Sequence, residues 1–336
     1  MSAGETVAVD TAARGFDQKV LAALFVRLGA FGAFALILLY FALTARGFTS
    51  AFNILNVVEQ SAILGILAYG MTVVFIGTGT DVQTGGIDLS IAANAGLCAA
   101  VYATLAKTGY PDIVAVIATL ATGLAVSALN AVAVVWLGIL PLLATLAVMN
   151  IAAGVELILT ENTVVSASSP LLSLLVSGSF LGVSALAWCL IIVSLVMAAV
   201  IHFSRLGLRL YAVGSHPEAA RAAGIDVGTY QAISFLFSGL AAGVASILIV
   251  SRLSASTPGT GLLLLPILAA ALLGTVFSRR LVPTIGGTLM AALFIGFLAN
   301  GFQLSGVSSY WVNGVQGALI LLVVAATSFA RPSDGG

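Results

Sequence analysis

Apolar residues fall along the chain in runs of about 20 positions, with short polar stretches between them. A run of about 20 apolar residues can cross the roughly 30 Å hydrocarbon core of a membrane as an α-helix. About ten such runs occur, over residues 21–43, 54–76, 87–107, 113–137, 139–159, 183–203, 230–250, 262–277, 282–300 and 312–329. The pattern predicts an all-α, polytopic membrane protein of about ten transmembrane helices.

The remaining segments are too short or too polar to span a membrane. Residues 171–181 are apolar but stand among serines and glycines, so we expect an interfacial or re-entrant piece there. We expect residues 1–20 to form a flexible cytoplasmic tail and residues 21–330 to form a single transmembrane domain. A cytoplasmic loop at 204–229 lies within that domain, and residues 331–336 form a C-terminal tail.

Basic residues are unevenly divided between the two sets of predicted loops. One side, which includes the N-terminus, receives Arg14, Lys19, Arg205, Arg209, Arg221, Arg279, Arg280 and Arg331. The other side receives only Arg46, Lys107 and Arg252, while Arg27 lies within the first span. Because cytoplasmic loops carry an excess of Lys and Arg, the first side is predicted to be cytoplasmic. An even number of spans with both termini in the cytoplasm follows.

Composition agrees with this class. The chain of 336 residues is 60% hydrophobic and 7% charged, with a mean hydropathy of +1.17, whereas a soluble domain is about 25% charged. The formal net charge is zero, which gives no reason to expect nucleic acid as a partner. Both cysteines, Cys98 and Cys189, lie in apolar runs without metal-ligand spacing, so we expect them to be packing residues.

The loop at 204–229 contains the pattern of a short capped helix. Ser215 can cap the first turn, and Glu218 can reach back to it. Pro217 fits in this turn because its missing amide hydrogen is not needed there, and Gly224 can end the helix in a left-handed conformation. Such a helix in a membrane-protein loop favours a docking site for a soluble partner. A surface turn that merely joins two spans is an equally good interpretation of the pattern alone.

The sequence lacks the motifs of common catalytic sites. No Gly-x-x-x-x-Gly-Lys-Ser/Thr phosphate loop occurs, and His202 and His216 form no His-Glu-x-x-His pair. The glycine-rich residues 77–86 contain no lysine and follow a membrane span, which indicates a turn at a cytoplasmic re-entry. We therefore expect no catalytic residue, no metal site and no cofactor bound by this chain.

Burying an acidic residue in a membrane span costs free energy, so such residues usually have a function or a polar partner. Glu59 and Glu156 lie within or near predicted spans, whereas Asp88 lies in the first turn of the third span, where a helix N-terminus favours negative charge. Glu59 and Glu156 would be the coupling groups if the chain were an ion-driven carrier. Such carriers usually have several acidic residues spread over facing helices, and this chain has few. We therefore favour the interpretation that Glu59 pairs with the neighbouring Gln60 or Asn56 and has no role in coupling.

Several motifs occur together in order. Residues 84–90 read Thr-Gly-Gly-Ile-Asp-Leu-Ser, preceded by Gly-Met-Thr at 70–72. Asn130, Leu-Pro at 140–141 and Ala-Thr-Leu-Ala at 144–147 follow, then the loop at 211–225 and Gly-Val-Ser-Ser-Tyr-Trp at 306–311. Over nearly all of the chain after residue 50, this order resembles the permease subunits of bacterial ribose, xylose, arabinose and galactose ABC importers.

The resemblance implies a permease driven by ATP and Mg²⁺ on a partner ABC ATPase. It implies a second permease copy or a related permease, a periplasmic sugar-binding protein, and the fold of the vitamin B12 importer class. The implied ATPase-coupling helix comprises Ser215, Pro217, Glu218, Ala219, Ala220, Arg221, Ala223 and Gly224, and the family motif loop contains Gly85, Gly86, Asp88 and Ser90. Polar residues expected along a solute pathway near the dimer axis are Asn56, Gln60, Asn94, Asn130, Asn150 and Asn300.

Two segments depart from the family pattern. Residues 77–83 are added before the Thr-Gly-Gly-Ile-Asp motif, and apolar residues 262–265 with residues 274–280 replace an acidic and then glycine-rich segment. Despite these departures, the resemblance implies an importer permease in the bacterial inner membrane for a monosaccharide or related polyol. An ion-gradient-driven secondary transporter of a small polar solute is the principal alternative, and a membrane scaffold without transport is the third.

Overall fold

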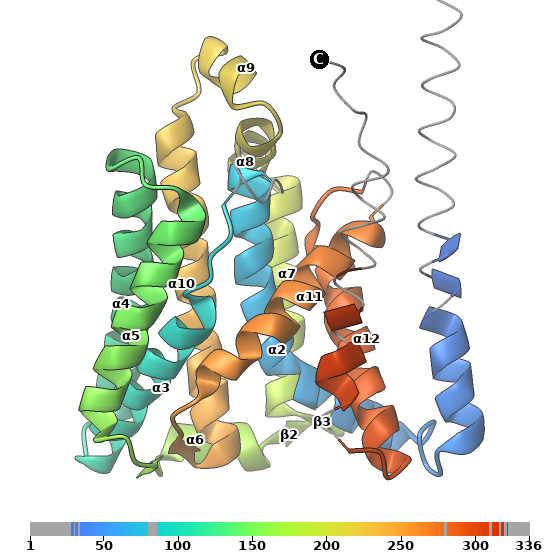
Figure 1. Cartoon of the computed structure of the whole chain (residues 1–336). Helices are drawn as coiled ribbons and strands as arrows, with labels where there is room; N and C mark the ends of the chain where they lie inside the picture. Colours follow the sequence, from blue (N-terminus) through green and yellow to red (C-terminus); the bar gives the residue numbers. More distant parts are fainter. Residues whose placement is uncertain are drawn as a thin grey trace, which may run out of the picture.

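The computed structural model describes residues 28–29, 31–32, 34–79, 86–278, 281–308, 311–315, 317–318 and 321. Its described part is a bundle of long helices, most of them roughly parallel, with short strand pairs at one end (Figure 1). The two predicted tails, at 1–20 and 331–336, and Gly85 of the motif loop lie outside the described residues.

Six helices in this part of the chain are long and apolar enough to cross a membrane. They are α2 (Ala51–Thr78), α4 (Asp112–Ala131) with the π-helical turn Val132–Trp136, α5 (Pro141–Thr160), α7 (Ala185–Phe203), α10 (Val227–Leu253) and α12 (Ile285–Leu304). Shorter apolar helices cover Phe34–Thr44, α3 (Ile91–Lys107), and a 3-10 turn, Thr260–Leu263, joined to α11 (Leu264–Val276). The polytopic helical class is confirmed.

Helices α2 and α10 form the centre of the bundle. They pack against each other along their lengths, and α2 also contacts α7, α8, α11 and α12. Helix α4 approaches α10 so closely that a Cβ at Gly123 would collide with the carbonyl of Gly239, and one at Gly239 with the carbonyl of Gly123. Small residues permit this backbone contact, which is how helices gain packing energy inside a membrane.

Helix α3 begins inside the bundle instead of at its edge. Helix α2 ends at Thr78, and the chain re-enters as an extended segment, Gly86–Asp88, before α3 starts at Ile91 (Figure 1). The side-chain oxygen of Thr78 accepts from the Gly86 amide at 2.8 Å, which fixes this re-entry. Thus Gly77 and Thr78, at the start of the added segment, extend α2.

The predicted non-spanning segment at 171–181 lies at one end of the bundle. It forms α6 (Pro170–Ser177), capped by the Ser169 hydroxyl, followed by the β2–β3 hairpin (Ser179–Phe180 and Val183–Ser184). Strand β1 (Val165–Ser166) pairs antiparallel with β4 (Ala255–Ser256) at the same end.

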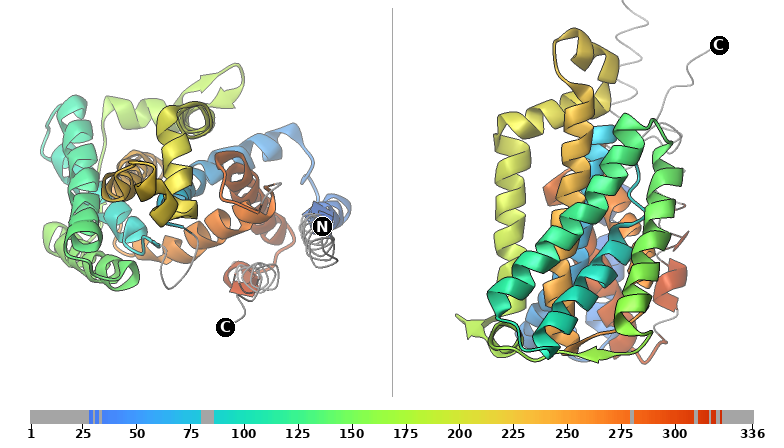
Figure 2. Two further views of the ribbon diagram at one scale, coloured as in Figure 1. Left: turned by 90° about the horizontal axis from the view of Figure 1, so that it is seen from above. Right: turned by 90° about the vertical axis from the view of Figure 1, so that its left-hand side faces the viewer.

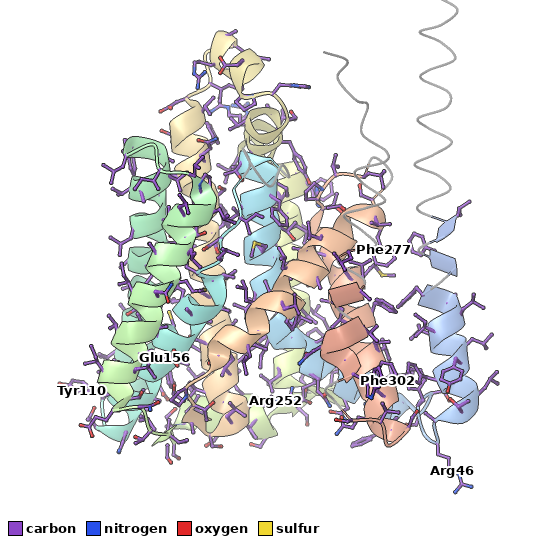
Figure 3. All side chains as sticks on the ribbon, in the orientation of Figure 1. Arg46, Tyr110, Glu156, Arg252, Phe277 and Phe302 are labelled. Atoms are coloured by element: carbon purple, nitrogen blue, oxygen red, sulfur yellow. The ribbon has the colours of Figure 1, made fainter. Side chains whose placement is uncertain are left out.

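The other end of the bundle carries α8 (Arg205–Ser215) and α9 (Pro217–Ala222) (Figure 1). Arg46 and Arg252 lie at the end opposite these two helices (Figure 3). The basic residues that the sequence assigns to opposite sides, Arg209 and Arg221 against Arg46 and Arg252, are therefore separated along the bundle axis.

Candidate functional site

The capping predicted for the loop helix is wrong at its start. Ser215 is the last residue of α8, and its hydroxyl donates backward to the Ala212 carbonyl at 3.2 Å. The N-cap of α9 is His216, which makes no side-chain capping bond, and Glu218 pairs with Arg221 at 2.7 Å instead of reaching back. Pro217 does occupy the first turn, as predicted.

The predicted stop of α9 is confirmed. Gly224 has φ +79°, and its amide donates to the Arg221 carbonyl at 3.0 Å. The Ile225 amide donates to the Ala220 carbonyl, also at 3.0 Å, which completes the Schellman pair of hydrogen bonds. No atom lies near the position of an added Cβ at Gly224, so only backbone conformation requires glycine there.

The alanines of α9 divide into two faces. Ala220 is 4% exposed and packs into a small cluster with Val213 and Val227, so it holds α9 against α8 and α10. Ala219 and Ala223 are exposed, as are the paired Glu218 and Arg221. The expectation that Ala220 faces a partner is wrong, because its side chain is used inside the chain.

Helix α8 fixes α9 to the end of the bundle. A Cβ at Gly214 would collide with the Ile76 carbonyl, so α8 lies directly on the last turn of α2. The Arg209 guanidinium donates to the Tyr230 hydroxyl at 2.7 Å, which joins α8 to the first turn of α10. Hydrogen bonds from Thr229 to Asp226, the N-cap of α10, lower the pKa of this carboxyl.

A second candidate site is the buried carboxylate of Asp88. It accepts from the Ser90 hydroxyl at 2.6 Å, the Ser90 amide at 3.0 Å, the Asn130 amide group at 3.2 Å and the Ser238 hydroxyl at 2.6 Å. Asp88, Ser90, Asn130 and Ser238 are all fully buried. We call these four residues the Asp88 cluster; it joins the start of α3 to α4 and α10.

Asp88 lies three residues before α3 begins at Ile91, so the prediction that it occupies the first turn of this helix is wrong, and its complete burial was not predicted. Sequence reasoning missed Ser238, which lies 150 positions from Asp88 in an apolar helix and donates a hydrogen bond to its carboxylate. A serine within an apolar span is the one signal available, and many such serines bond only to their own helix, as Ser246 does.

Predicted pathway residue Asn94 belongs to a neighbouring polar group. Its side-chain amide donates to the Gly123 carbonyl at 3.1 Å and lies 3.4 Å from the Ser127 hydroxyl. The thiol of Cys98 lies near the Asn94 side chain and the Thr119 carbonyl, in agreement with a packing role. This group extends the polar contact between α3 and α4.

The other predicted pathway residues lie apart from these. Asn300 exchanges two hydrogen bonds with Asn53, at 2.8 and 3.1 Å, in a buried amide pair between α12 and α2. Gln60 donates to Asn56 at 3.1 Å on a half-buried part of α2. Asn150 is exposed on α5 and bonds only within its own helix. Within one chain, the six predicted pathway residues therefore do not line a single solute pathway.

The two acids considered for ion coupling differ. Glu156 is 4% exposed on α5, its carboxylate lies against the Gly96 backbone of α3, and its Oε1 has no hydrogen-bond partner among the described residues (Figure 3). Glu59 is half-buried on α2 and makes no ion pair with a described residue; the predicted pairing with Asn56 or Gln60 is wrong, because those two bond to each other.

Comparison with known proteins identifies the class. Residues 53–324 match the family described as the permease component of branched-chain amino acid transport systems. The chain belongs to this permease family. With its long apolar helices, it is a multi-pass membrane protein.

Its relatives include two ribose import permeases. The Escherichia coli (strain K12) protein is 37% identical over 281 residues, which cover 81% of this chain and 84% of the relative. The Bacillus subtilis protein is 30% identical over 301 residues, covering 89% and 91%. An autoinducer 2 import system permease protein of Klebsiella pneumoniae is 30% identical over 276 residues, covering 80% of each chain. The predicted resemblance to sugar importer permeases is confirmed.

Proposed function

We propose that this chain is the membrane-spanning subunit of an ABC importer for a monosaccharide or a related polyol, with ATP hydrolysis on a partner ATPase. The observation that carries the proposal is the similarity to ribose import permeases over most of both chains. The exposed, sharply terminated α9 supports it, because it offers a rigid contact surface at one end of the bundle.

The packing of α9 suggests how a partner could move the membrane helices. Ala220 fixes α9 to α8 and α10, and α10 continues along α2 and α4 through the centre of the bundle. A displacement of α9 would therefore move α10 as a rigid element. ATP binding and hydrolysis on the partner would then shift the population between outward-open and inward-open arrangements.

The full assembly that we propose follows the family. It has ten spans per chain in the arrangement of the vitamin B12 importer class, with both termini in the cytoplasm, in the bacterial inner membrane. A second copy or a related permease completes the pathway, and a periplasmic sugar-binding protein delivers the solute. Among the six predicted pathway residues, we assign solute contact first to Asn56, Gln60 and Asn150, whose side chains retain surface exposure.

The first prediction concerns topology. In a background with Cys98 and Cys189 replaced by alanine, a cysteine at Ser215 should react with a membrane-impermeant thiol reagent only from the cytoplasmic side. A cysteine at Ser168, exposed at the opposite end, should react only from the periplasm. Reaction of both cysteines from one side would contradict the proposed orientation.

The energy source is tested by uptake measurements. Cells that express the permease with its ATPase and binding protein should keep taking up labelled ribose when a protonophore collapses the proton gradient and ATP is maintained. The Glu156→Gln permease, matched to wild type in membrane abundance, should behave in the same way. Uptake that stops with the gradient alone, and that Glu156→Gln also abolishes, would identify an ion-driven carrier instead.

A further inference from the structure

The β2–β3 hairpin projects sideways from the bundle. Strand β2 pairs antiparallel with β3, Ser179 with Ser184 and Phe180 with Val183, so Leu181 and Gly182 form the tip. Figure 2 shows the hairpin at the end of the bundle beside α7, extending across the helix axes instead of continuing along them. A loop that reaches for a soluble partner would more naturally extend along the axes, away from the membrane.

The tip of the hairpin exposes apolar side chains. Phe180 is 65% exposed and Leu181 is 80% exposed, and no charged residue occurs between positions 162 and 204. Leu181 also has φ +54°, a left-handed conformation that is unfavourable for a non-glycine residue. Two large apolar side chains exposed together at the tip, with no charged residue near them, indicate that the surroundings in the working protein are apolar.

A tryptophan supports the base of the hairpin. The indole N–H of Trp188 donates to the Phe180 carbonyl at 3.1 Å, and the two rings lie 6.0 Å apart. Trp188 is in the first turn of α7. Tryptophan at the end of an apolar membrane helix is typical of the boundary between hydrocarbon and headgroups, where its ring is apolar and its N–H needs a polar partner.

The hairpin is continuous with an apolar face of α7. Ile192, Leu195 and Val196 are each more than half exposed on this helix, which is one of the six that can span a membrane. In a bilayer such a face contacts lipid chains. The sideways direction of the hairpin places Phe180 and Leu181 beside the same lipid, at the level where α7 enters the membrane.

We propose that the β2–β3 hairpin is a lipid-binding element that inserts Phe180 and Leu181 into the membrane interface at the end opposite α8 and α9. Its ligand is a phospholipid surface. The tip lies among the parts of the acyl chains that are next to the headgroups. The hairpin holds the entry of α7 at a fixed depth, and no protein partner covers it.

The test uses single-tryptophan variants of the full chain in phospholipid vesicles. Trp136, Trp188 and Trp311 are replaced by phenylalanine, which keeps an aromatic ring against Phe180, and Leu181→Trp provides the probe. Thr163→Trp in the same background is the matched control, because Thr163 is exposed in a polar turn near the same end of the bundle. Fluorescence quenching is measured with lipids brominated near the headgroup and with aqueous iodide.

We expect brominated lipid to quench the probe at position 181 strongly and iodide to quench it weakly, with the reverse at position 163. Quenching of position 181 by iodide but not by lipid would show that the tip faces water. Quenching by neither reagent would show that protein covers the tip. Either result overturns the proposal, and neither depends on whether the chain transports a sugar.

Discussion

Replacement of Asp88 by alanine should unfold the permease or leave it severely destabilised. The change removes the acceptor for the Ser90 hydroxyl and amide, the Ser238 hydroxyl and part of the Asn130 amide, all fully buried. Each buried donor without a partner costs about 1–3 kcal/mol, so several together approach the 5–15 kcal/mol that stabilises a typical domain. The measurement is the yield and thermal unfolding midpoint of the purified protein in detergent.

Two variants make this expectation specific. Asp88→Asn keeps the size of the side chain and one acceptor oxygen, so its midpoint should lie between those of wild type and Asp88→Ala. Asn150→Ala removes an exposed side chain that bonds only within α5, so it should unfold close to wild type. An Asp88→Ala protein that unfolds at the wild-type temperature would show that the Asp88 cluster does not hold α3, α4 and α10 together.

The positions of the long helices could be predicted because spanning length is a property of local sequence. The predicted run 113–137 corresponds to Asp112–Trp136, and the run 139–159 corresponds to Pro141–Thr160. The depth at which α3 begins could not be predicted in this way. Residues 87–107 are mostly apolar, and packing against α4 and α10 accompanies the extended segment by which the chain re-enters before Ile91.

The loop helix shows a different limit. Ser215 is a good N-cap residue by type. However, Ser204 caps α8 by accepting a hydrogen bond from the Gly207 amide, and the helix continues through Ser215. The cap of a helix depends on where the preceding helix ends, which the local pattern leaves open. The stop at Gly224 was predicted correctly, because a left-handed position is a local backbone requirement that glycine meets.

Which polar residues contact one another could be known only from the tertiary structure. Asn94 and Asn130 could be selected from sequence as unusual polar residues in apolar spans. Their partners are a backbone carbonyl at Gly123 and the distant residue Asp88, contacts that no local pattern contains. The same limit applies to Asn300, whose partner, Asn53, is 247 positions away.

Bulky substitutions on the exposed face of α9 should separate the permease from the partner ATPase that we propose. Ala219→Trp and Ala223→Trp place a large side chain on a surface that we propose to be closely packed against the partner, while removing no buried group. Overpacking of a tight contact costs about 1–3 kcal/mol, which weakens association by about 5- to 150-fold. Co-purification with the ATPase and uptake of labelled ribose should both fall, with membrane abundance unchanged.

Four further variants separate docking from the folding of the loop. Thr163→Trp introduces the same side chain at the opposite end and should leave association intact, whereas Ala220→Trp should disturb α9 itself because Ala220 is buried against Val213 and Val227. Gly224→Val should weaken coupling more than Gly224→Asn, since only asparagine tolerates the left-handed conformation at φ +79°. If Ala219→Trp and Ala223→Trp permeases bind the ATPase and transport ribose as wild type does, α9 is a connecting turn and the partner docks elsewhere.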